Sequence, residues 1–322
     1  MGRLRASGAV GVVVWAAAGF CLAWALMRTF GLERGFPLQA VVAWTPFVVP
    51  VAALVAILAG VGRRRGALAC AALATVLLLV AVVPRVLGGG HEPAGADGPE
   101  LRVLSANLKL GLADPEALVE LVAANEIELL CVQELTPEML AGLERAGLFD
   151  LLPHRVLAPG ASSDGSAILA RYPLRELESV EPPGYTFVMP RAEIAVPGAA
   201  PVEAVSVHPV PPTGSQAVTA WEEGLDSLPA TGAGPLTLLI GDFNATLDHR
   251  ELREVVDRGY VDAGDAIGGG LAPTWPERLA RPGVTIDHVL ADRRAAITDY
   301  AVHDLPGSDH RAVSAVLRLP DG

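Results

Sequence analysis

Six clusters of chemically capable side chains border predicted strands of this 322-residue chain. Strand ends are where α/β folds collect functional groups on a rigid frame. Taken singly, each cluster is more often a turn or a helix cap. Together they contain Asp, Asn, Glu and His and no Ser or Cys nucleophile pattern, which favours a site of carboxylates, amides and imidazoles. The clusters are Asn107, Gln133-Glu134, His208, Gly241-Asp242-Phe243-Asn244, Asp287-His288 and Ser308-Asp309-His310.

The elements that must position these clusters alternate between strands and helices. Asp114-Pro115-Glu116 and Thr136-Pro137-Glu138 each supply an N-cap, a proline at the first helical position and an acid in the first turn. Further helices are predicted over 216–228 and 252–256. An α/β or α+β domain of about 220 residues follows, large enough for a substantial core. Apolar runs predict strands over 101–106, 127–132, 165–170, 191–196, 202–207, 236–240, 284–290, 297–303 and 312–319.

The composition divides the chain at about residue 90. Residues 1–90 hold eight Arg, no Lys and one acid, Glu33, whereas the remaining 232 residues hold 16 basic and 35 acidic side chains. The two parts therefore carry formal charges of +7 and −19. An apolar content of 51% excludes a mainly disordered chain, and three cysteines exclude a disulfide scaffold. Cys131 lies in an apolar run and is predicted to pack in the core.

The basic part contains three apolar runs without a charged side chain, at 9–27, 37–61 and 66–84. About 20 apolar residues cross a bilayer, so residues 1–87 are predicted to form a bundle of three transmembrane helices. Two alternatives remain. The first run could be a cleaved signal peptide, and the second, interrupted by Pro46 and Pro50, could be a kinked or re-entrant hairpin.

The arginines of the basic part predict an orientation. Arg3 and Arg5 precede the first run, and 63–65 is an Arg triplet between the second and third. Both groups fall on one side of a three-span bundle, and short basic loops stay in the cytoplasm. The Gly-rich segment 88–99 is then a flexible linker, and 100–322 is an extracytoplasmic domain of a multi-pass membrane protein.

The clusters, in their order along the chain, resemble the endonuclease/exonuclease/phosphatase superfamily, which includes DNase I-like nucleases, sphingomyelinases and inositol-phosphate phosphatases. The most specific motifs are Gly-Asp-Phe-Asn and Ser-Asp-His. The resemblance implies an α/β fold with four layers, in which two packed mixed β-sheets are flanked by helices, and Mg²⁺-dependent hydrolysis of a phosphoester, with Mn²⁺ as an alternative metal. The resemblance extends over about residues 100–320. It rests on the motifs Ser105-Ala106-Asn107, Gln133-Glu134, Gly165–Arg171, His208, Gly241–Asn244, Thr274-Trp275, Ile286-Asp287-His288 and Ser308-Asp309-His310.

The resemblance also implies the metal ligands. Glu134 is the principal ligand, with Asn107 beside it and Asp309 contributing. Mg²⁺ prefers one or two carboxylates together with water and substrate oxygens, and it neutralises charge on the phosphoryl and leaving oxygens. Some nucleases of the family carry an acid two positions after the first-strand Asn. Here that position is Lys109, so a second metal ligand there is absent.

Catalytic roles follow from the same resemblance. Asp242 orients or deprotonates the attacking water, and Asn244 donates to a non-bridging phosphoryl oxygen. His208 and His310 stabilise developing charge or protonate the leaving group, although no acidic partner for His208 is evident. Asp287 fixes the tautomer of His310. By contrast, Asp262 and Asp265 are interpreted as a solvated loop rather than a second metal site, and His288 as a turn or surface residue.

The predicted substrate is a phosphorylated lipid or lipid-linked molecule of the membrane. A charge of −19 argues against tight nucleic-acid binding, which relies on Lys and Arg. A cleft tethered above a bilayer meets lipid headgroups at high effective concentration. The layout resembles membrane-anchored actinobacterial phosphoesterases of the teicoplanin-resistance type, which implies a polyprenyl phosphate or cell-wall lipid carrier. Two alternatives are an extracellular DNase I-like nuclease and a non-catalytic binding or sensor module.

Overall fold

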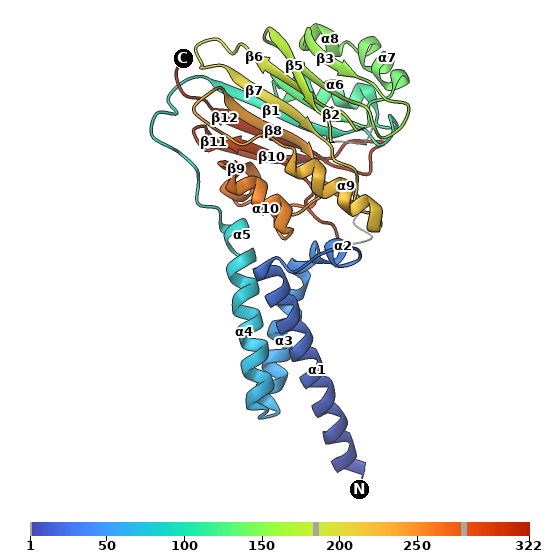
Figure 1. Ribbon diagram of the computed structural model, residues 1–322, viewed down its shortest axis with the longest axis vertical. Helices are drawn as coiled ribbons and strands as arrows, with labels where there is room; N and C mark the ends of the chain where they lie inside the picture. The colour runs from blue at the N-terminus through green and yellow to red at the C-terminus, as the bar shows by residue number, and fades with distance from the viewer. Residues whose placement is uncertain (1, 183–186, 278–281) are drawn as a thin grey trace. The chain divides into compact units, whose positions relative to one another are not determined.

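The computed structural model describes residues 2–182, 187–277 and 282–322 (Figure 1). The chain forms two compact units. The helical unit contains the residues up to Pro84 together with Leu247–Arg250, and the outer unit contains Arg85–Thr246 and Glu251–Gly322. Each unit has its own core.

The helical unit is built from α1 (Gly2–Phe30), α2 (Leu38–Val42), α3 (Thr45–Val61) and α4 (Arg65–Val82). Small side chains lie where the long helices meet: Ala18, Ala59, Ala67 and Ala71 are fully buried. Small residues let helix backbones approach closely, as in membrane bundles. Large apolar side chains point outward instead, among them Val13, Phe20, Leu54 and Val76. The unit is thus apolar on its outside, the reverse of a water-soluble bundle.

Among the described residues, two helical segments are long and apolar enough to cross a membrane, Ala9–Phe30 and Arg65–Leu87, the latter combining α4 with the short α5 (Pro84–Leu87). They match the first and third predicted spans. Over the second predicted span, 37–61, the chain breaks between α2 and α3 at 43–44, so the long helix of this stretch begins at Thr45 and has 17 residues. Its crossing of a membrane stays a prediction. Pro46 stands in the first turn of α3, where proline starts a helix rather than continuing one. At 1.5 Å per residue, α3 is about 26 Å long, shorter than a bilayer core.

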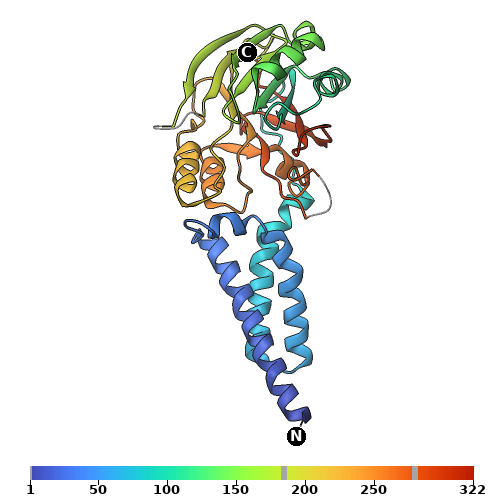
Figure 2. The same ribbon diagram turned by 90° about the vertical axis from the view of Figure 1, so that its right-hand side faces the viewer.

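The described residues of the outer unit form two six-stranded mixed sheets, which Figures 1 and 2 show from two sides. Sheet A has the order β11-β12-β1-β2-β4-β3, and sheet B has the order β5-β6-β7-β8-β10-β9. One parallel pair lies inside each sheet, β1 with β2 and β7 with β8, and the other neighbours are antiparallel. The strands are β1 (Glu100–Asn107), β2 (Leu129–Gln133), β3 (His154–Ala158), β4 (Ser166–Ala170), β5 (Leu174–Val180), β6 (Met189–Ile194), β7 (Val202–Val207), β8 (Leu236–Asp242), β9 (Tyr260–Asp262), β10 (Asp287–Asp292), β11 (Ala296–His303) and β12 (Ala312–Arg318).

The two sheets pack face to face and helices cover their outer faces, which confirms the predicted four-layer α/β sandwich. Side chains from both sheets form the central core, including Val103, Cys131 and Leu238, so the core position predicted for Cys131 is confirmed. A second cluster lies between sheet A and its helices. The helices are α6 (Pro115–Ala124), α7 (Pro137–Arg145), α8 (Leu148–Leu151), α9 (Ser215–Asp226), α10 (Arg250–Asp257) and α11 (Ala263–Ile267).

Local signals in the sequence agree with the elements formed. Asp114 Oδ1 accepts the Ala117 N–H at 3.2 Å and Thr136 Oγ1 accepts the Met139 N–H at 3.2 Å, so both predicted N-caps begin helices. The sequence missed three strands, β3, β5 and β9, and each of them is an edge strand. β3 has one buried residue, β5 has none, and β9 has three residues in all. An edge strand needs no continuous apolar run, because one of its two hydrogen-bonding edges faces water.

The predicted linker 88–99 is attached to the outer unit through its backbone. The N–H groups of Gly89 and Gly90 donate to the Ala266 carbonyl at 3.1 and 2.9 Å, and the Gly98 N–H donates to Leu319 at 2.9 Å. The boundary between the units accordingly falls at Pro84, ahead of this segment.

Candidate active site

Strand register brings the predicted site residues together. In sheet A, Asn107 at the end of β1 stands level with Gln133 at the end of β2, and Glu134 follows directly. In sheet B, Asp242 at the end of β8 pairs with Asp287 at the start of β10. Val207, the last residue of β7, is level with Gly241, which places His208 beside Asp242. Both sheets therefore present polar residues at the same end of the sandwich.

We call Asn107, Glu134 and Asp242 the carboxylate half of the site. The Asn107 amide Nδ2 donates to Glu134 Oε1 at 3.2 Å and to Asp242 Oδ2 at 3.0 Å, so one amide links the two sheets. Glu134 Oε2 accepts the Leu110 N–H at 2.7 Å. Among the described residues, the Asn107 amide is the side-chain donor that both carboxylates share at hydrogen-bonding distance, which leaves their negative charge only partly compensated.

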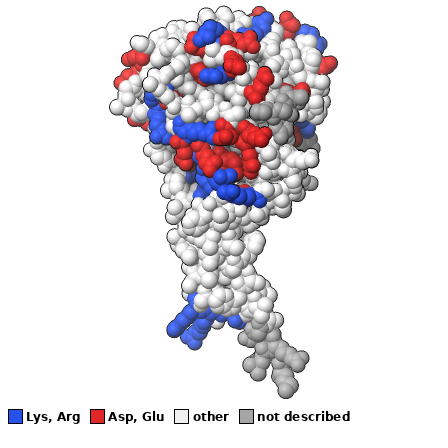
Figure 3. Space-filling model, in the orientation of Figure 1, with Lys and Arg blue, Asp and Glu red and all other residues white. Residues whose placement is uncertain are grey.

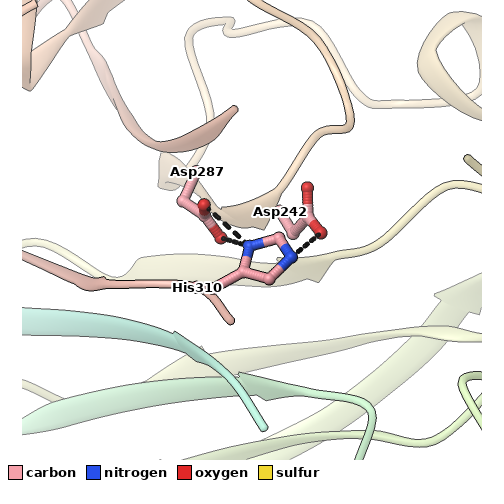
Figure 4. A group of neighbouring side chains, drawn as sticks. All are labelled: Asp242, Asp287 and His310. Atoms are coloured by element: carbon pink, nitrogen blue, oxygen red, sulfur yellow. Dashed lines mark hydrogen bonds and ion pairs between the residues drawn. The ribbon is translucent and has the colours of Figure 1, made fainter. Parts of the chain in front are cut away.

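We call Asp287, Ser308 and His310 the histidine half, and Figure 4 shows two of these residues, Asp287 and His310, beside Asp242. Both carboxylate oxygens of Asp287 lie near His310 Nδ1, at 3.2 and 3.0 Å, and His310 Nε2 points toward Asp242 Oδ2 at 3.8 Å. Ser308 Oγ accepts the His310 N–H at 3.0 Å and donates to the Asn107 carbonyl at 2.8 Å. Asp287 thus lies against the imidazole at hydrogen-bonding distance, and Ser308 links the His310 backbone to β1.

The electrostatic environment gives the titrating groups different charges. Burial opposes charge on His310, but Asp287 and Asp242 outweigh it and raise its pKa to about 10, so the ring is an imidazolium at neutral pH. Burial, with the Asp287 charge, raises the pKa of Asp242, which makes this carboxylate a better proton acceptor than a surface Asp. Burial lowers the pKa of His208, which is therefore neutral.

His208 has the acidic neighbours that the sequence did not reveal. Its Nε2 lies 3.9 Å from Glu134 Oε1 and 3.8 Å from Asp242 Oδ2. The ring is buried and packs against Phe187, with the ring centroids 5.3 Å apart. A neutral imidazole between two carboxylates can donate a hydrogen bond to a phosphoryl oxygen.

Asn244 belongs to a left-handed turn beside Asp242. Its φ is +50°, and its backbone N–H donates to Asp242 Oδ1 at 2.8 Å. Its side-chain amide donates to the Pro209 carbonyl at 3.1 Å, which leaves a second amide hydrogen for a ligand. Asn is among the residues that adopt this backbone conformation most readily.

Asp309 lies at the margin of the site. Its Oδ2 accepts from Trp275 Nε1 at 3.4 Å, and the Trp275 ring centroid is 6.5 Å from that of His310. Within the described part of the chain, no hydrogen bond or ion pair joins Asp309 to Glu134 or Asn107. Seven of the eight predicted site residues form one connected group, and Asp309 borders it.

Two places in the site could receive a divalent cation. Asp242, Asp287 and His310 offer ligand atoms within 4.8 Å of one another. One of these three ligands is an imidazole nitrogen, whereas Mg²⁺ prefers oxygen ligands. Glu134 and Asn107 next to Asp242 supply the oxygen ligands that Mg²⁺ prefers, with uncompensated negative charge. The carboxylate half is therefore the better fit for the metal.

Several supporting residues were not assigned a role from the sequence. Gln133 Nε2 donates to Ser206 Oγ at 3.2 Å and joins the two sheets beneath the site. Thr274 Oγ1 accepts the N–H groups of Ile286 and Asp287 at 3.0 and 3.2 Å. Gln133 and Thr274 stand in the family-like motifs, which was the available signal; nothing in the sequence marked Ser206.

Comparison with known proteins agrees with this geometry. The model of the Endonuclease/Exonuclease/phosphatase family matches residues 104–310. The chain resembles an endonuclease/exonuclease/phosphatase from Beutenbergia cavernae (TM-score 0.57, 18% identity, 68% of this chain and 72% of that chain). It also resembles D. rerio TDP2 complexed with a single-strand DNA product (0.53, 16%, 68% and 98%) and a protein from Enterococcus faecalis (0.52, 17%, 67% and 99%). A search of curated proteins found no match.

The chain belongs to the endonuclease/exonuclease/phosphatase family. Enzymes of this family are divalent-metal-dependent hydrolases of phosphoester bonds, and the site holds the carboxylates, amides and imidazoles that this reaction needs. The predictions of family and enzyme class are confirmed. The predicted resemblance to a membrane-anchored subtype of the family is not tested by these comparisons and stays a prediction.

Proposed function

We propose that this protein is a membrane-anchored, Mg²⁺-dependent phosphoesterase that hydrolyses a phosphate ester or pyrophosphate of a membrane lipid or cell-wall lipid carrier outside the cytoplasm. One observation carries the proposal: the chain combines the family's site with a helical unit whose apolar surface faces outward. Mn²⁺ is the alternative metal.

The exposure of the helices supports membrane insertion. Each of the two long helices buries 28% of its most apolar stretch, whereas a core helix of a soluble protein is mostly buried. A signal peptide would account for the first helix alone, because the second ends at Leu87. The face of the helical unit seen in Figure 3 is free of charge along its length, and basic residues gather where α3 meets α4, the segment containing Arg63, Arg64 and Arg65. Short basic segments favour the cytoplasmic side.

Exposed apolar side chains around the site support a lipid-like substrate. Among the described residues after Glu100, four large hydrophobic side chains are exposed: Leu110, Leu112, Ile267 and Trp275. Three of these border the site. Leu110 donates its N–H to Glu134, Trp275 contacts Asp309, and the Leu112 carbonyl lies against Gly307, two residues before Asp309. An apolar margin around a phosphoester site suits a substrate with a hydrocarbon portion.

The residues divide the chemistry between them. Bound at Glu134 and Asn107, the metal would neutralise charge on the phosphoryl group and leaving oxygen. Asp242, with its raised pKa, accepts a proton from the attacking water. Asn244 and neutral His208 donate to phosphoryl oxygens, and the His310 imidazolium stabilises negative charge or protonates the leaving oxygen.

The test uses the full chain in lipid nanodiscs with Mg²⁺. Undecaprenyl pyrophosphate, a phosphodiester lipid and plasmid DNA are offered in parallel, with Asp242→Ala as the inactive control. Release of phosphate or a headgroup from one of the lipids, absent in the control, is expected. Nicking of DNA while both lipids stay intact would contradict the lipid assignment.

A nuclease is the second candidate, because one structural neighbour was solved with a single-strand DNA product. The charge of −19 after residue 90 disfavours it, since non-specific DNA binding depends on Lys and Arg. A non-catalytic binding or sensor module is disfavoured by the connected group of seven site residues.

A further inference from the structure

A buried pair outside the proposed catalytic group, Asp262 and His288, has no role in the mechanism above. Both were interpreted from the sequence as loop or surface residues, and that interpretation is wrong, since their exposed fractions are 5% and 3%. Asp262 ends β9 and His288 follows Asp287 in β10, so strand pairing brings them together. A buried polar pair of this kind is retained only where its hydrogen bonds are made.

The His288 ring is bonded at both nitrogens. Nδ1 lies 2.7 Å from Asp262 Oδ2, and Nε2 lies 2.9 Å from the Ala245 carbonyl oxygen. A carbonyl can only accept, so Nε2 carries a hydrogen and donates it to Ala245. The other Asp262 oxygen accepts the Asp265 N–H at 2.8 Å, which fixes the carboxylate that orients the ring.

Ala245 is the residue after Asn244, in the turn that leaves β8. Two further hydrogen bonds hold this turn. The Phe243 N–H donates to the Ile286 carbonyl at 2.9 Å, and the Phe243 carbonyl accepts from Trp221 Nε1 at 3.0 Å. The Phe243 ring meets His288 edge-on, with centroids 5.6 Å apart. A non-glycine residue in the left-handed region, here Asn244, persists where surrounding contacts determine it.

We infer that His288, oriented by Asp262, is a positioning residue that fixes the Asn244 turn through its hydrogen bond to the Ala245 carbonyl. The same turn directs the Asn244 N–H onto Asp242, so His288 acts on two proposed catalytic groups without contacting either. Small displacements of such groups are costly to a reaction that depends on alignment. The kinetic part of this inference rests on the proposed hydrolase function, whereas the structural part does not.

The experiment compares three variants of the full chain in nanodiscs. His288→Leu removes the donor, His288→Gln retains an amide N–H, and Tyr260→Phe is the matched control, because it removes another buried hydrogen bond from β9, the 2.8 Å bond to Pro229. Backbone hydrogen exchange at 243–246 is expected to accelerate in His288→Leu, to recover partly in His288→Gln and to stay unchanged in Tyr260→Phe. Unchanged exchange at 243–246 in both His288 variants would overturn the inference.

Kinetics with bis(p-nitrophenyl) phosphate and Mg²⁺ provide the second readout. His288→Leu is expected to lower kcat about 10- to 100-fold, the range for residues that support a functional group, with KM within about twofold. His288→Gln should regain part of kcat, and Tyr260→Phe should match the parent protein. If the parent protein is inert toward this diester and toward both lipids of the nanodisc test, the proposed function fails, while the exchange result still decides the role of His288. If His288→Leu does not fold, ¹⁵N spectra of histidine-labelled parent protein test the role of His288 instead. A hydrogen on His288 Nε2 is expected, and an unprotonated Nε2 would overturn the inference.

Discussion

The two halves of the site meet at Asp242, and they differ in the charge of the groups that contact their carboxylates. In the carboxylate half, Glu134 and Asp242 share one neutral amide donor, Asn107. In the histidine half, the Asp287 carboxylate holds a charged His310. Among the described residues, Glu134 is contacted by the neutral donors Asn107 and the Leu110 N–H, whereas Asp287 is paired with a cation.

We propose that this difference gives each half a separate task. A half with uncompensated carboxylates attracts a metal ion, whereas a half with an internal ion pair supplies a fixed positive charge and a proton. A phosphoester reaction uses both, because negative charge develops on the phosphoryl oxygens and on the leaving oxygen. Variants that change one half and spare the other test the division.

The largest effect is expected at the group where the two halves meet. Asp242→Ala removes the proposed proton acceptor and should lower kcat by about 10²- to 10⁴-fold, the usual contribution of a general base. The measurement is steady-state hydrolysis of bis(p-nitrophenyl) phosphate by the full chain. Asp226→Asn, which changes an exposed carboxylate paired with Arg258, is the control and should leave kcat unchanged. Full activity in Asp242→Ala would remove Asp242 from the mechanism.

Glu134→Gln tests the carboxylate half alone. It keeps the side-chain shape but removes the charge, so the Mg²⁺ concentration for half-maximal activity should rise about 100-fold, at the upper end of the effects of groups that support metal ligands. A Mg²⁺ titration of the initial rate measures it. Glu138→Gln on the exposed first turn of α7 is the matched control. An unchanged Mg²⁺ requirement in Glu134→Gln would show that the metal binds elsewhere.

Asp287→Asn tests the histidine half. The neutral amide no longer stabilises the His310 charge, and kcat should fall about 10- to 100-fold. The Mg²⁺ requirement should stay near that of the parent protein, because the carboxylate half is intact. A change in the Mg²⁺ requirement as large as that of Glu134→Gln would break the distinction between the halves.

The smallest effect is a pH dependence that originates in His310. Its pKa is raised to about 10 in the folded protein, above the ordinary value of about 6.5, so its charge persists through neutral pH. The stabilisation from this ion pair is complete below about pH 6.5 and is lost as the pH rises through about 10. The melting temperature of the parent protein should therefore approach that of His310→Gln between pH 7 and 10. An equal difference at both pH values would contradict the raised pKa.

Residues with local signals were predictable from the sequence. The N-caps Asp114 and Thr136 and the buried strands formed as expected, because local hydrogen bonds and continuous apolar runs specify them. The four strand-end motifs of the family led to Asn107, Glu134, Asp242 and His310. These signals are contained within a few residues of sequence.

Contacts between residues that lie far apart in the sequence could not be predicted. The acidic neighbours of His208 come from the residue after β2 and from β8, and the partners of His288 come from β9 and the turn after β8. The edge strands β3, β5 and β9 lack a continuous apolar run, and the break before α3 depends on the local effect of Pro46 outweighing hydropathy. Composition does not encode any of these contacts.

The central claim, that the carboxylate half and not the histidine half holds the metal, is tested most directly by anomalous diffraction from crystals of the full chain grown with Mn²⁺. The account predicts one anomalous peak within coordination distance of the Glu134 carboxylate and the Asn107 amide oxygen, with His310 still bonded to Asp287. A peak coordinated by Asp287 and His310 instead would contradict it.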